Sequence, residues 1–407
     1  MPPLLASAAV ATTSTLVQEK LDQAVEILRE REIDLWLTFV RETMLTNDPC
    51  LDLIAGVYSA WTGAFMVSAT GERIAIVGRF DAPSVEQVGG YEVIGYDESI
   101  KPALLATVER LDPRSIALNY STSDPAADGL THGLWLELQE TFADTPFVQR
   151  FRSSEKLVNA LRGRKSAAEV ERIQAAARET EEIFDSVGRA LRANLSETEI
   201  AALMHDEVAR RGLGYACGRD HCPAVNAGPE KEVGHAPPGE LRTRRGELLH
   251  IEIGVSRDSA ASDLQRVWYF LDEDETAAPD DVVRAWDALW ASVDAGAAAL
   301  VPGAAGWEVD AAARESLVAA GYAEPMHAFG HQLGRSAHDG GTTRAPRWDR
   351  YGSAPFGLVE VGNVFTLEYG TAVPGRGYIG LEEDVLVTDD GIEWLSTPQR
   401  ELWLVTS

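Results

Sequence analysis

Residues 248–271 read LLHIEIGVSRDSAASDLQRVWYFL, two strand-like runs joined by a short polar segment. Side chains alternate along a strand, so the apolar residues of LLHIEIG face one way while His250 and Glu252 face the other. Asp263 stands immediately before the second apolar run. The stretch therefore predicts two neighbouring strands that carry acidic residues opposite or beside their apolar faces.

Two later strand-like runs repeat this arrangement. In FTLEYG, residues 365–370, Glu368 opposes the apolar side chains. In GLEEDVLVT, residues 380–388, Glu382 and Asp384 share one face. Each carboxylate alone is typical of a solvated strand. Their recurrence in strand after strand instead favours a site at which they converge in the folded sheet.

A histidine-rich, glycine-rich segment lies between these strands. It reads HAFGHQLGRSAHDGG over residues 327–341, and its glycines exclude one regular helix. The segment carries His327, His331 and His338, and one imidazole would join four strand carboxylates in the expected site. Oxygen ligands with a single imidazole suit Mn²⁺, Co²⁺, Fe²⁺ or Zn²⁺. Four carboxylates repel one another strongly, and a pair of divalent ions is the natural counter-charge.

The rest of the chain divides into two parts. Residues 1–155 alternate helical and strand patterns and predict an α/β domain, preceded by a loose tail of about 20 residues. Residues 156–407 begin with two capping boxes, Ser166 to Glu169 and Ser196 to Glu199, and continue into the strands already described. Expected elements include strands at 33–40, 65–67, 74–77, 116–118, 248–254, 267–271, 364–369 and 385–388, and helices at 101–111, 282–293 and 309–320.

Composition excludes several classes of function. The 407 residues include 36 Lys+Arg and 64 Asp+Glu, a net charge of −28. Such a charge repels phosphate backbones and anionic lipid, so neither nucleic acid nor a membrane is expected as a partner. The sequence contains no apolar run of about 18 residues, the length that a membrane-spanning helix needs. Three cysteines make no disulfide framework, and no basic residue precedes Lys20, so a cytoplasmic protein is expected.

The ordered motifs GHAPP, IEIG, SDLQR, FGHQLGRSAH, FTLEYG and LEEDVLVTDDG resemble those of the pita-bread metallopeptidases. That family includes methionine aminopeptidase, Xaa-Pro aminopeptidase and prolidase, and also the metal-free creatinase. The resemblance spans about residues 155–400, and residues 1–155 resemble the N-terminal domain of the creatinase and prolidase branch. It implies an α/β N-terminal domain followed by an α+β pita-bread catalytic domain.

The resemblance also implies roles for individual residues. The five metal ligands would be Glu252, Asp263, His331, Glu368 and Glu382. The spacings 263 − 252 = 11 and 338 − 331 = 7 match those of the family. Asp263 and Glu382 would bridge two divalent ions (Mn, Co or Zn), with Glu252 on one ion and His331 and Glu368 on the other. The catalytic residues would be His235 and His338, which contact substrate, and Glu368 as proton shuttle.

The activity that the resemblance implies is hydrolysis of the peptide bond before proline by an Xaa-Pro dipeptidase. A hydroxide that bridges two ions would attack the carbonyl of a small peptide with proline at its second position, and the chain would be a homodimer. One alternative is an Xaa-Pro aminopeptidase. A second is a non-peptidase of the same fold that acts on a small amide, amidine or osmolyte, and a third is a non-catalytic binding protein.

Three positions depart from the family pattern. Glu252 stands where Asp is usual, and its extra methylene changes reach and chelation geometry. Ala260 replaces a tyrosine, which removes a hydroxyl near the bridging water. Gly380 stands where an arginine is frequent, two residues before the last ligand, and Arg376 is a candidate to substitute for it. These differences bear on metal occupancy, rate and substrate choice.

The remaining histidines and one tryptophan have competing interpretations. His205 and the segment 217–222, with its two cysteines and one histidine, are interpreted as structural. His250 shares a strand face with Glu252, so support of the metal ligands is the alternative to a structural role. His327 is left open between the two. Trp61 is interpreted as structural, with a substrate contact across a dimer as the alternative.

Overall fold

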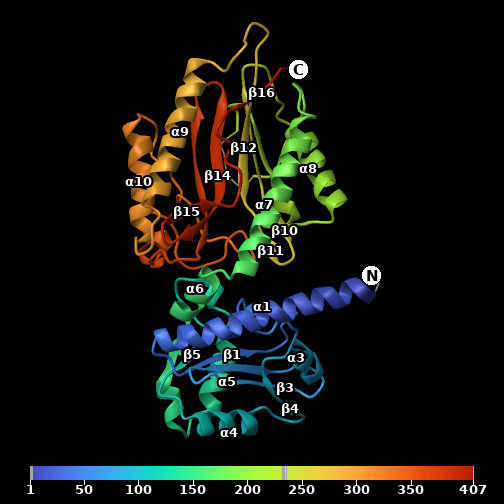
Figure 1. The fold of residues 1–407 in the computed structure, drawn as a ribbon, viewed down its shortest axis with the longest axis vertical. Helices are drawn as coiled ribbons and strands as arrows, with labels where there is room; N and C mark the ends of the chain where they lie inside the picture. Colours follow the sequence, from blue (N-terminus) through green and yellow to red (C-terminus); the bar gives the residue numbers. More distant parts are fainter. Residues whose placement is uncertain (1–2, 232–233, 235, 407) are drawn as a thin grey trace. The chain divides into compact units, whose positions relative to one another are not determined.

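The computed structural model describes residues 3–231, 234 and 236–406, and contacts divide the chain into two compact units, Met1–Arg162 and Gly163–Ser407 (Figure 1). Within the described residues, no helix combines the length and the apolar character that a bilayer span requires.

The first unit contains a six-stranded mixed sheet. Its strands are β1 (Leu35–Val40), β2 (Gly63–Ser68), β3 (Arg73–Gly78), β4 (Glu92–Tyr96), β5 (Ile116–Leu118) and β6 (Phe151–Ser153). They lie in the order β4-β3-β2-β1-β5-β6, with antiparallel pairs only at β1–β2 and β2–β3. Every residue of β1 and β2 is buried, because helices cover both faces of the sheet.

The helices of the first unit form two outer layers (Figure 1). They are α1 (Pro3–Glu30), α2 (Leu51–Ile54), α3 (Ala82–Val88), α4 (Lys101–Leu111), α5 (His132–Thr141) and α6 (Glu155–Gly163), with 3-10 turns η1 (Pro125–Ala127) and η2 (Pro146–Arg150). Trp36 and Val67 pack with α1, α2, α3 and α6, whereas Leu37 and Met66 pack with α4 and α5. Alternate strand residues thus supply two separate cores.

The second unit is built on a larger, mainly antiparallel sheet. Its strands are β7 (Gly214–Tyr215), β8 (Ala224–Ala227), β9 (Leu248–Ile253), β10 (Val255–Arg257), β11 (Ala260–Ala261), β12 (Leu264–Phe270), β13 (Val364–Val373), β14 (Gly377–Thr388), β15 (Gly391–Trp394) and β16 (Trp403–Val405). The main order is β13-β14-β12-β9-β8, with β15 beside β14 and β16 beside β12. A small sheet, β11-β10-β7, lies apart from it.

Two pairs of helices flank this sheet (Figure 1). They are α7 (Ala167–Gly188), α8 (Glu197–Arg211), α9 (Asp280–Ala299) and α10 (Gly306–Ala319), with 3-10 turns η3 (Arg219–His221), η4 (Asp349–Tyr351) and η5 (Ala354–Phe356). Ile251 of β9 lies in the core with α7 and α8, whereas Leu367 of β13 and Leu381 of β14 lie in the core with α9 and α10. Alternation then directs the acidic neighbours of these residues to the opposite face of the sheet.

Local signals of the sequence are confirmed where they are strong. Ser166 and Ser196 each accept from the backbone three residues on, and the matching glutamates close both capping boxes. The helix at Lys101–Leu111 and the strand at Ile116–Leu118 have the expected bounds. The expectation of a loose N-terminal tail is wrong. Helix α1 begins at Pro3, and Val17 on its inner face is 1% exposed.

Candidate metal centre

Strand pairing places three carboxylates in a single row across the sheet. Gln265 of β12 pairs with Glu252 of β9 on one side and with Glu382 of β14 on the other. Glu382 in turn pairs with Glu368 of β13. Directly paired residues point to the same face, with Cβ atoms about 5 Å apart. The register therefore gathers Glu252, Glu382 and Glu368 around Gln265 from four adjacent strands.

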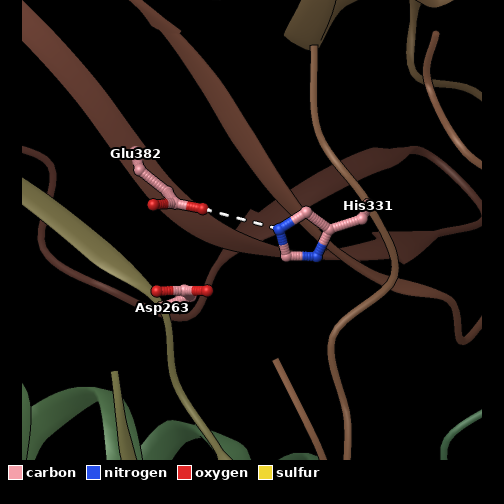
Figure 2. Close-up of side chains that lie close together, drawn as sticks. All are labelled: Asp263, His331 and Glu382. Atoms are coloured by element: carbon pink, nitrogen blue, oxygen red, sulfur yellow. Dashed lines mark ion pairs between the residues drawn. The ribbon is translucent and has the colours of Figure 1, made fainter. Parts of the chain in front are cut away.

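The closest group joins this row to a histidine. Asp263, His331 and Glu382 each offer one ligand atom, and these atoms lie within 4.8 Å of one another (Figure 2). Nε2 of His331 is 3.8 Å from Oε1 of Glu382 and 3.5 Å from Oε1 of Glu368. Among the residues that the structure describes, no other group of three potential ligands is this close. Four of the five expected ligands are thus in mutual reach.

The fifth expected ligand, Glu252, interacts electrostatically with the other carboxylates. Its carboxylate raises the pKa of Asp263, of Glu368 and of Glu382, which requires it to lie near all three. Glu252 is only partly buried, as is Glu368. The side chain at position 252 therefore lies near the group that the sequence predicts.

His331 is held in place by backbone contacts with β13. Gly330 has φ +142°, and a Cβ there would lie 2.4 Å from the carbonyl oxygen of Thr366. The N–H of Thr366 donates to the carbonyl of His331 at 3.0 Å, and Nη2 of Arg344 donates to the same carbonyl at 2.9 Å. Gln332 forms an isolated bridge to Phe365. Glycine at 330 thus lets the segment lie against the strand that carries Glu368.

The electrostatics of the group favour a bound cation. Burial, and then repulsion by neighbouring carboxylates, raises the pKa of Asp263 and Glu382 well above the ordinary range and that of Glu368 to about 8. Burial, with His338 and Arg344 nearby, lowers the pKa of His331 to about 3. The imidazole is therefore neutral and able to ligate. Carboxylate oxygens with one neutral imidazole form a donor set that fits Mn²⁺, Co²⁺, Fe²⁺ or Zn²⁺.

The two expected substrate-contacting histidines have different outcomes. His338 is exposed, and its ring centroid lies 4.2 Å from that of His331. His235 lies outside the described residues. His327 packs edge-on against Tyr369, and its Nδ1 contacts the carbonyl of Ala328 at 2.8 Å. The structure thus places one of the two expected contacts beside the metal ligands.

Other histidines and the tryptophan make local contacts. Nδ1 of His205 lies 2.5 Å from the hydroxyl of Tyr215. Trp61, in the first unit, packs against Phe80 and Tyr96. His250 is buried and hydrogen-bonded to Gln265 at 2.8 Å, and burial lowers its pKa to about 4.

The expectation that Arg376 replaces the arginine missing at position 380 is wrong. Arg376 pairs with Asp281 at 3.0 Å and donates to the carbonyl of Gly246 and the hydroxyl of Tyr269. It lies in the turn between β13 and β14, six residues before Glu382. At about 3.3 Å per strand residue, this separation is about 20 Å.

Three residues near the group received no role from the sequence. Gln265 donates from Nε2 to Oε2 of Glu382 at 3.1 Å. Asp384 is buried, and its Oδ2 accepts from the backbone N–H of Asp263 at 3.3 Å. Tyr378 packs edge-on against His250, and burial followed by the charge of Glu368 raises its pKa. Alternation alone places Tyr378 and Asp384 on the face of Glu382, so the sequence contained that signal.

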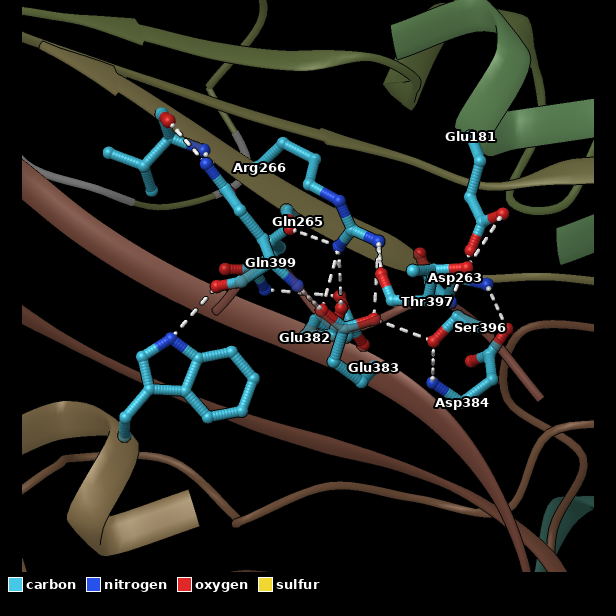
Figure 3. A network of polar contacts seen from close by, with 12 residues as sticks. Glu181, Asp263, Gln265, Arg266, Glu382, Glu383, Asp384, Ser396, Thr397 and Gln399 are labelled. Carbon is cyan, nitrogen blue, oxygen red and sulfur yellow. Dashed lines mark hydrogen bonds and ion pairs between the residues drawn. The ribbon is translucent and has the colours of Figure 1, made fainter. Parts of the chain in front are cut away.

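A second polar network lies beside the candidate ligands and involves Arg266 and Glu383 (Figure 3). Nη1 of Arg266 is 3.0 Å from Oε1 of Glu383, and both side chains are at most 2% exposed. Ser396 donates to Glu383 at 2.6 Å, and the backbone N–H of Gln399 donates at 2.9 Å. These bonds fix β12 against β14 next to the row of carboxylates.

Breaking this pair from one side is expected to destabilise the protein. Glu383→Gln leaves the guanidinium of Arg266 buried without its counter-charge, so the free energy of unfolding should fall by about 3 kcal/mol. Urea denaturation of chelator-treated protein measures this change. The double variant Arg266→Met/Glu383→Leu should cost less than the single change, because it leaves no buried charge unpaired. A double variant that is less stable than Glu383→Gln would contradict this account.

A family model independently covers the part of the chain that holds this site. The model of metallopeptidase family M24 matches residues 171–389. The chain belongs to metallopeptidase family M24. The resemblance stated from the sequence is therefore confirmed, and this M24 chain is by family a peptidase. The match includes all five expected metal ligands.

Relatives and solved structures extend beyond the matched region. An uncharacterized peptidase of Staphylococcus saprophyticus is 25% identical over 384 residues, which cover 93% of this M24 chain and 99% of the relative. The Xaa-Pro dipeptidase of Pyrococcus furiosus is 22% identical over 326 residues, 77% of this chain and 89% of the relative.

Two solved structures match nearly the whole M24 chain. The Xaa-Pro dipeptidase from Bacillus anthracis has a TM-score of 0.73 at 21% identity and covers 96% of this chain and 100% of its own. The X-Pro aminopeptidase from Thermotoga maritima has a TM-score of 0.71 at 23% identity, covering 95% and 99%. The expected fold, an α/β N-terminal part followed by a pita-bread part, is therefore confirmed.

Proposed function

We propose that this M24 peptidase hydrolyses the peptide bond before proline, as an Xaa-Pro dipeptidase. The observation that carries the proposal is the convergence of Asp263, His331 and Glu382 within 4.8 Å, with Glu368 3.5 Å from His331. The choice of proline is supported by the names of relatives, which include the Xaa-Pro dipeptidase of Pyrococcus furiosus.

Five side chains would hold two divalent ions, Mn²⁺, Co²⁺ or Zn²⁺. Asp263 and Glu382 would contact both ions, Glu252 one of them, and His331 with Glu368 the other. The raised pKa values of the buried carboxylates support this assignment, because each ion offsets their mutual repulsion. When bound, the ions would polarise the scissile carbonyl and lower the pKa of a water molecule toward neutrality.

Proton transfer and stabilisation of the developing charge would be carried out by side chains of this protein. Glu368 would carry the proton that the attacking water loses to the imino nitrogen of the leaving proline. In the net reaction, the acyl carbon gains OH and the proline nitrogen gains H. His338 is exposed beside His331 and would donate to the oxygen on which negative charge develops. His235 is proposed to contact the substrate near the same bond.

The proposal also assigns roles to the two domains and an oligomeric state. Residues 156–407 would form the catalytic domain, residues 1–155 would form the N-terminal domain, and the chain would work as a homodimer. An Xaa-Pro aminopeptidase is the second candidate, since the X-Pro aminopeptidase from Thermotoga maritima resembles this chain with a TM-score of 0.71. The two candidates differ in whether residues must follow the proline.

Release of the N-terminal amino acid from matched peptides tests the function, because cleavage before proline frees that residue from both dipeptides and tripeptides. Chelator-stripped protein is assayed on Ala-Pro, Leu-Pro and Ala-Pro-Ala, with Ala-Ala as the control, before and after addition of Mn²⁺, Co²⁺ or Zn²⁺. We expect metal-restored cleavage of the Xaa-Pro dipeptides alone. Cleavage only of the tripeptide would assign an aminopeptidase. No cleavage with any ion would overturn the peptidase proposal and favour a small amide or amidine as substrate.

A further inference from the structure

Four buried side chains form a continuous chain of hydrogen bonds that ends on Glu382. They come from four adjacent strands: Asn226 of β8, His250 of β9, Gln265 of β12 and Glu382 of β14. Nδ2 of Asn226 lies 3.0 Å from Nδ1 of His250, and Nε2 of His250 lies 2.8 Å from Oε1 of Gln265. Nε2 of Gln265 donates to Oε2 of Glu382 at 3.1 Å. Each of the four is at most 6% exposed.

Glu382, the final acceptor, sets which group donates and which accepts along the series of hydrogen bonds. When Glu382 ligates a cation its carboxylate is ionised and can only accept, so the amide nitrogen of Gln265 then faces Glu382, as it does in the structure, and its oxygen faces His250. His250 must then carry its proton on Nε2. The lone pair on Nδ1 accepts from the amide of Asn226. One tautomer of one neutral imidazole therefore satisfies every contact in the series.

Glycine at position 380 makes room for this series. A Cβ at Gly380 would lie 2.3 Å from Oε1 of Gln265 and 2.5 Å from Nε2 of His250. Both contacts are closer than a real Cβ atom allows, so any side chain at 380 would displace the bond between His250 and Gln265. Position 380 is also where the sequence departs from its family pattern by lacking an arginine. The space that such a side chain would need is filled by the His250–Gln265 pair.

We propose that Asn226, His250 and Gln265 are positioning residues that orient Glu382 as a metal ligand in place of an arginine at position 380. Gln265 takes Oε2, which leaves Oε1 turned toward His331 at 3.8 Å. The inference rests on the proposed function, because it treats Glu382 as a ligand. An uncharged amide orients the carboxylate without offsetting its negative charge, so the full charge stays available to the cation.

Metal affinity of the full chain tests the role of Gln265. Calorimetric titration with Mn²⁺ should show a 10- to 100-fold weaker affinity for Gln265→Met than for the wild type. The matched control is Gln399→Met. Gln399 is also buried, and its side chain bonds to the backbone of β12 at Val267 with distances of 3.0 and 2.8 Å, whereas its backbone N–H donates to Glu383. The control should bind Mn²⁺ within twofold of the wild type, and equal affinities for all three proteins would overturn the inference.

Gly380→Ala provides a second variant that leaves every hydrogen-bonding group in place. It should weaken Mn²⁺ binding about 10-fold, whereas Gly214→Ala, whose Cβ would meet nothing closer than 3.5 Å, should not. If Gly380 acts through Gln265, the double variant Gly380→Ala/Gln265→Met should bind no more weakly than Gln265→Met alone. Additive losses would overturn the inference.

The histidine tautomer gives a readout that does not depend on affinity. Long-range ¹H–¹⁵N spectra of histidine-labelled protein loaded with diamagnetic Zn²⁺, which keeps Glu382 ionised, should show His250 protonated on Nε2 and not on Nδ1, assigned by its absence from His250→Gln. Protonation on Nδ1 would overturn the inference. A wild type that binds no Mn²⁺, Co²⁺ or Zn²⁺ would instead overturn the metal proposal, and with it the ligand role of Glu382.

Discussion

Replacing Asp263 with asparagine is expected to abolish metal binding and to lower turnover of an Xaa-Pro dipeptide at least ~1000-fold, or about 4 kcal/mol of transition-state stabilisation. The amide preserves the volume of the side chain but removes the charge that the proposed ions require. Calorimetry with Mn²⁺ and release of proline measure the two effects. Full activity in Asp263→Asn would contradict the ligand assignment.

The same substitution should make the metal-free protein more stable. Asp263 is buried, and Glu252, Glu368 and Asp384 all raise its pKa, so its ionised form is unfavourable without a cation. Removing that charge at pH 8 should raise the free energy of unfolding by at least about 1 kcal/mol, since one pKa unit corresponds to about 1.4 kcal/mol. A site that binds metal thus weakens the fold that carries it.

Asp310→Asn is the matched control, because Asp310 is a buried aspartate whose role is structural. Its oxygens accept from Arg314 at 2.8 and 3.0 Å and from the hydroxyl of Tyr369 at 2.7 Å. Losing this charge leaves Arg314 with only the longer pair to the exposed Glu324, at 3.5 Å, and should cost about 3 kcal/mol of stability. Affinity for Mn²⁺ should not change. The two aspartates are therefore expected to give opposite signs for stability and opposite outcomes for metal binding.

Strand β14, which carries Glu382, was harder to delimit from sequence than β1 and β2 of the first unit. In β1 and β2 every residue is buried, so a continuous apolar run marks each strand. β14 begins at Gly377, but its apolar pattern becomes clear only from Val385. Among the intervening positions Glu383 lies on the apolar face between Leu381 and Val385 and breaks the alternation. Its buried ion pair with Arg266 thus obscures the pattern by which strands are recognised.

The convergence of the ligands depended on strand register, which no local pattern supplies. Gln265 and Glu382 are 117 residues apart and directly paired, whereas Arg376, six residues from Glu382, lies at the far end of the hairpin. Motif order and spacing implied the ligand set only through resemblance to a family. The role of Gln265 in contacting Glu382 had no signal in sequence, because its partners, His250 and Glu382, come from two other strands.

Metal removal is expected to make stability depend on pH in a direction opposite to ordinary acid denaturation. The folded protein raises the pKa of Glu368 from 4.5 to about 8, first through burial and then through the charge of Glu252. Between these values the folded state holds a proton that the unfolded state has released. Stability from this group is therefore fully present below pH 4.5 and is lost as the pH rises through 8. Asp263 and Glu382, whose pKa values are also raised, add to the same trend.

Bound ions should reverse this trend, because ligation requires the deprotonated carboxylates and releases their protons. We expect the melting temperature of chelator-treated protein to fall between pH 6 and pH 8, and the increase on adding Mn²⁺ to be larger at pH 8 than at pH 6. At 100 times its dissociation constant, the ion should add about 2.7 kcal/mol to the free energy of unfolding. Asp263→Asn serves as the control, since its melting temperature should not respond to Mn²⁺ at either pH. An equal response to Mn²⁺ at both pH values would show that binding is not linked to deprotonation of these carboxylates, and would remove the electrostatic argument for the site.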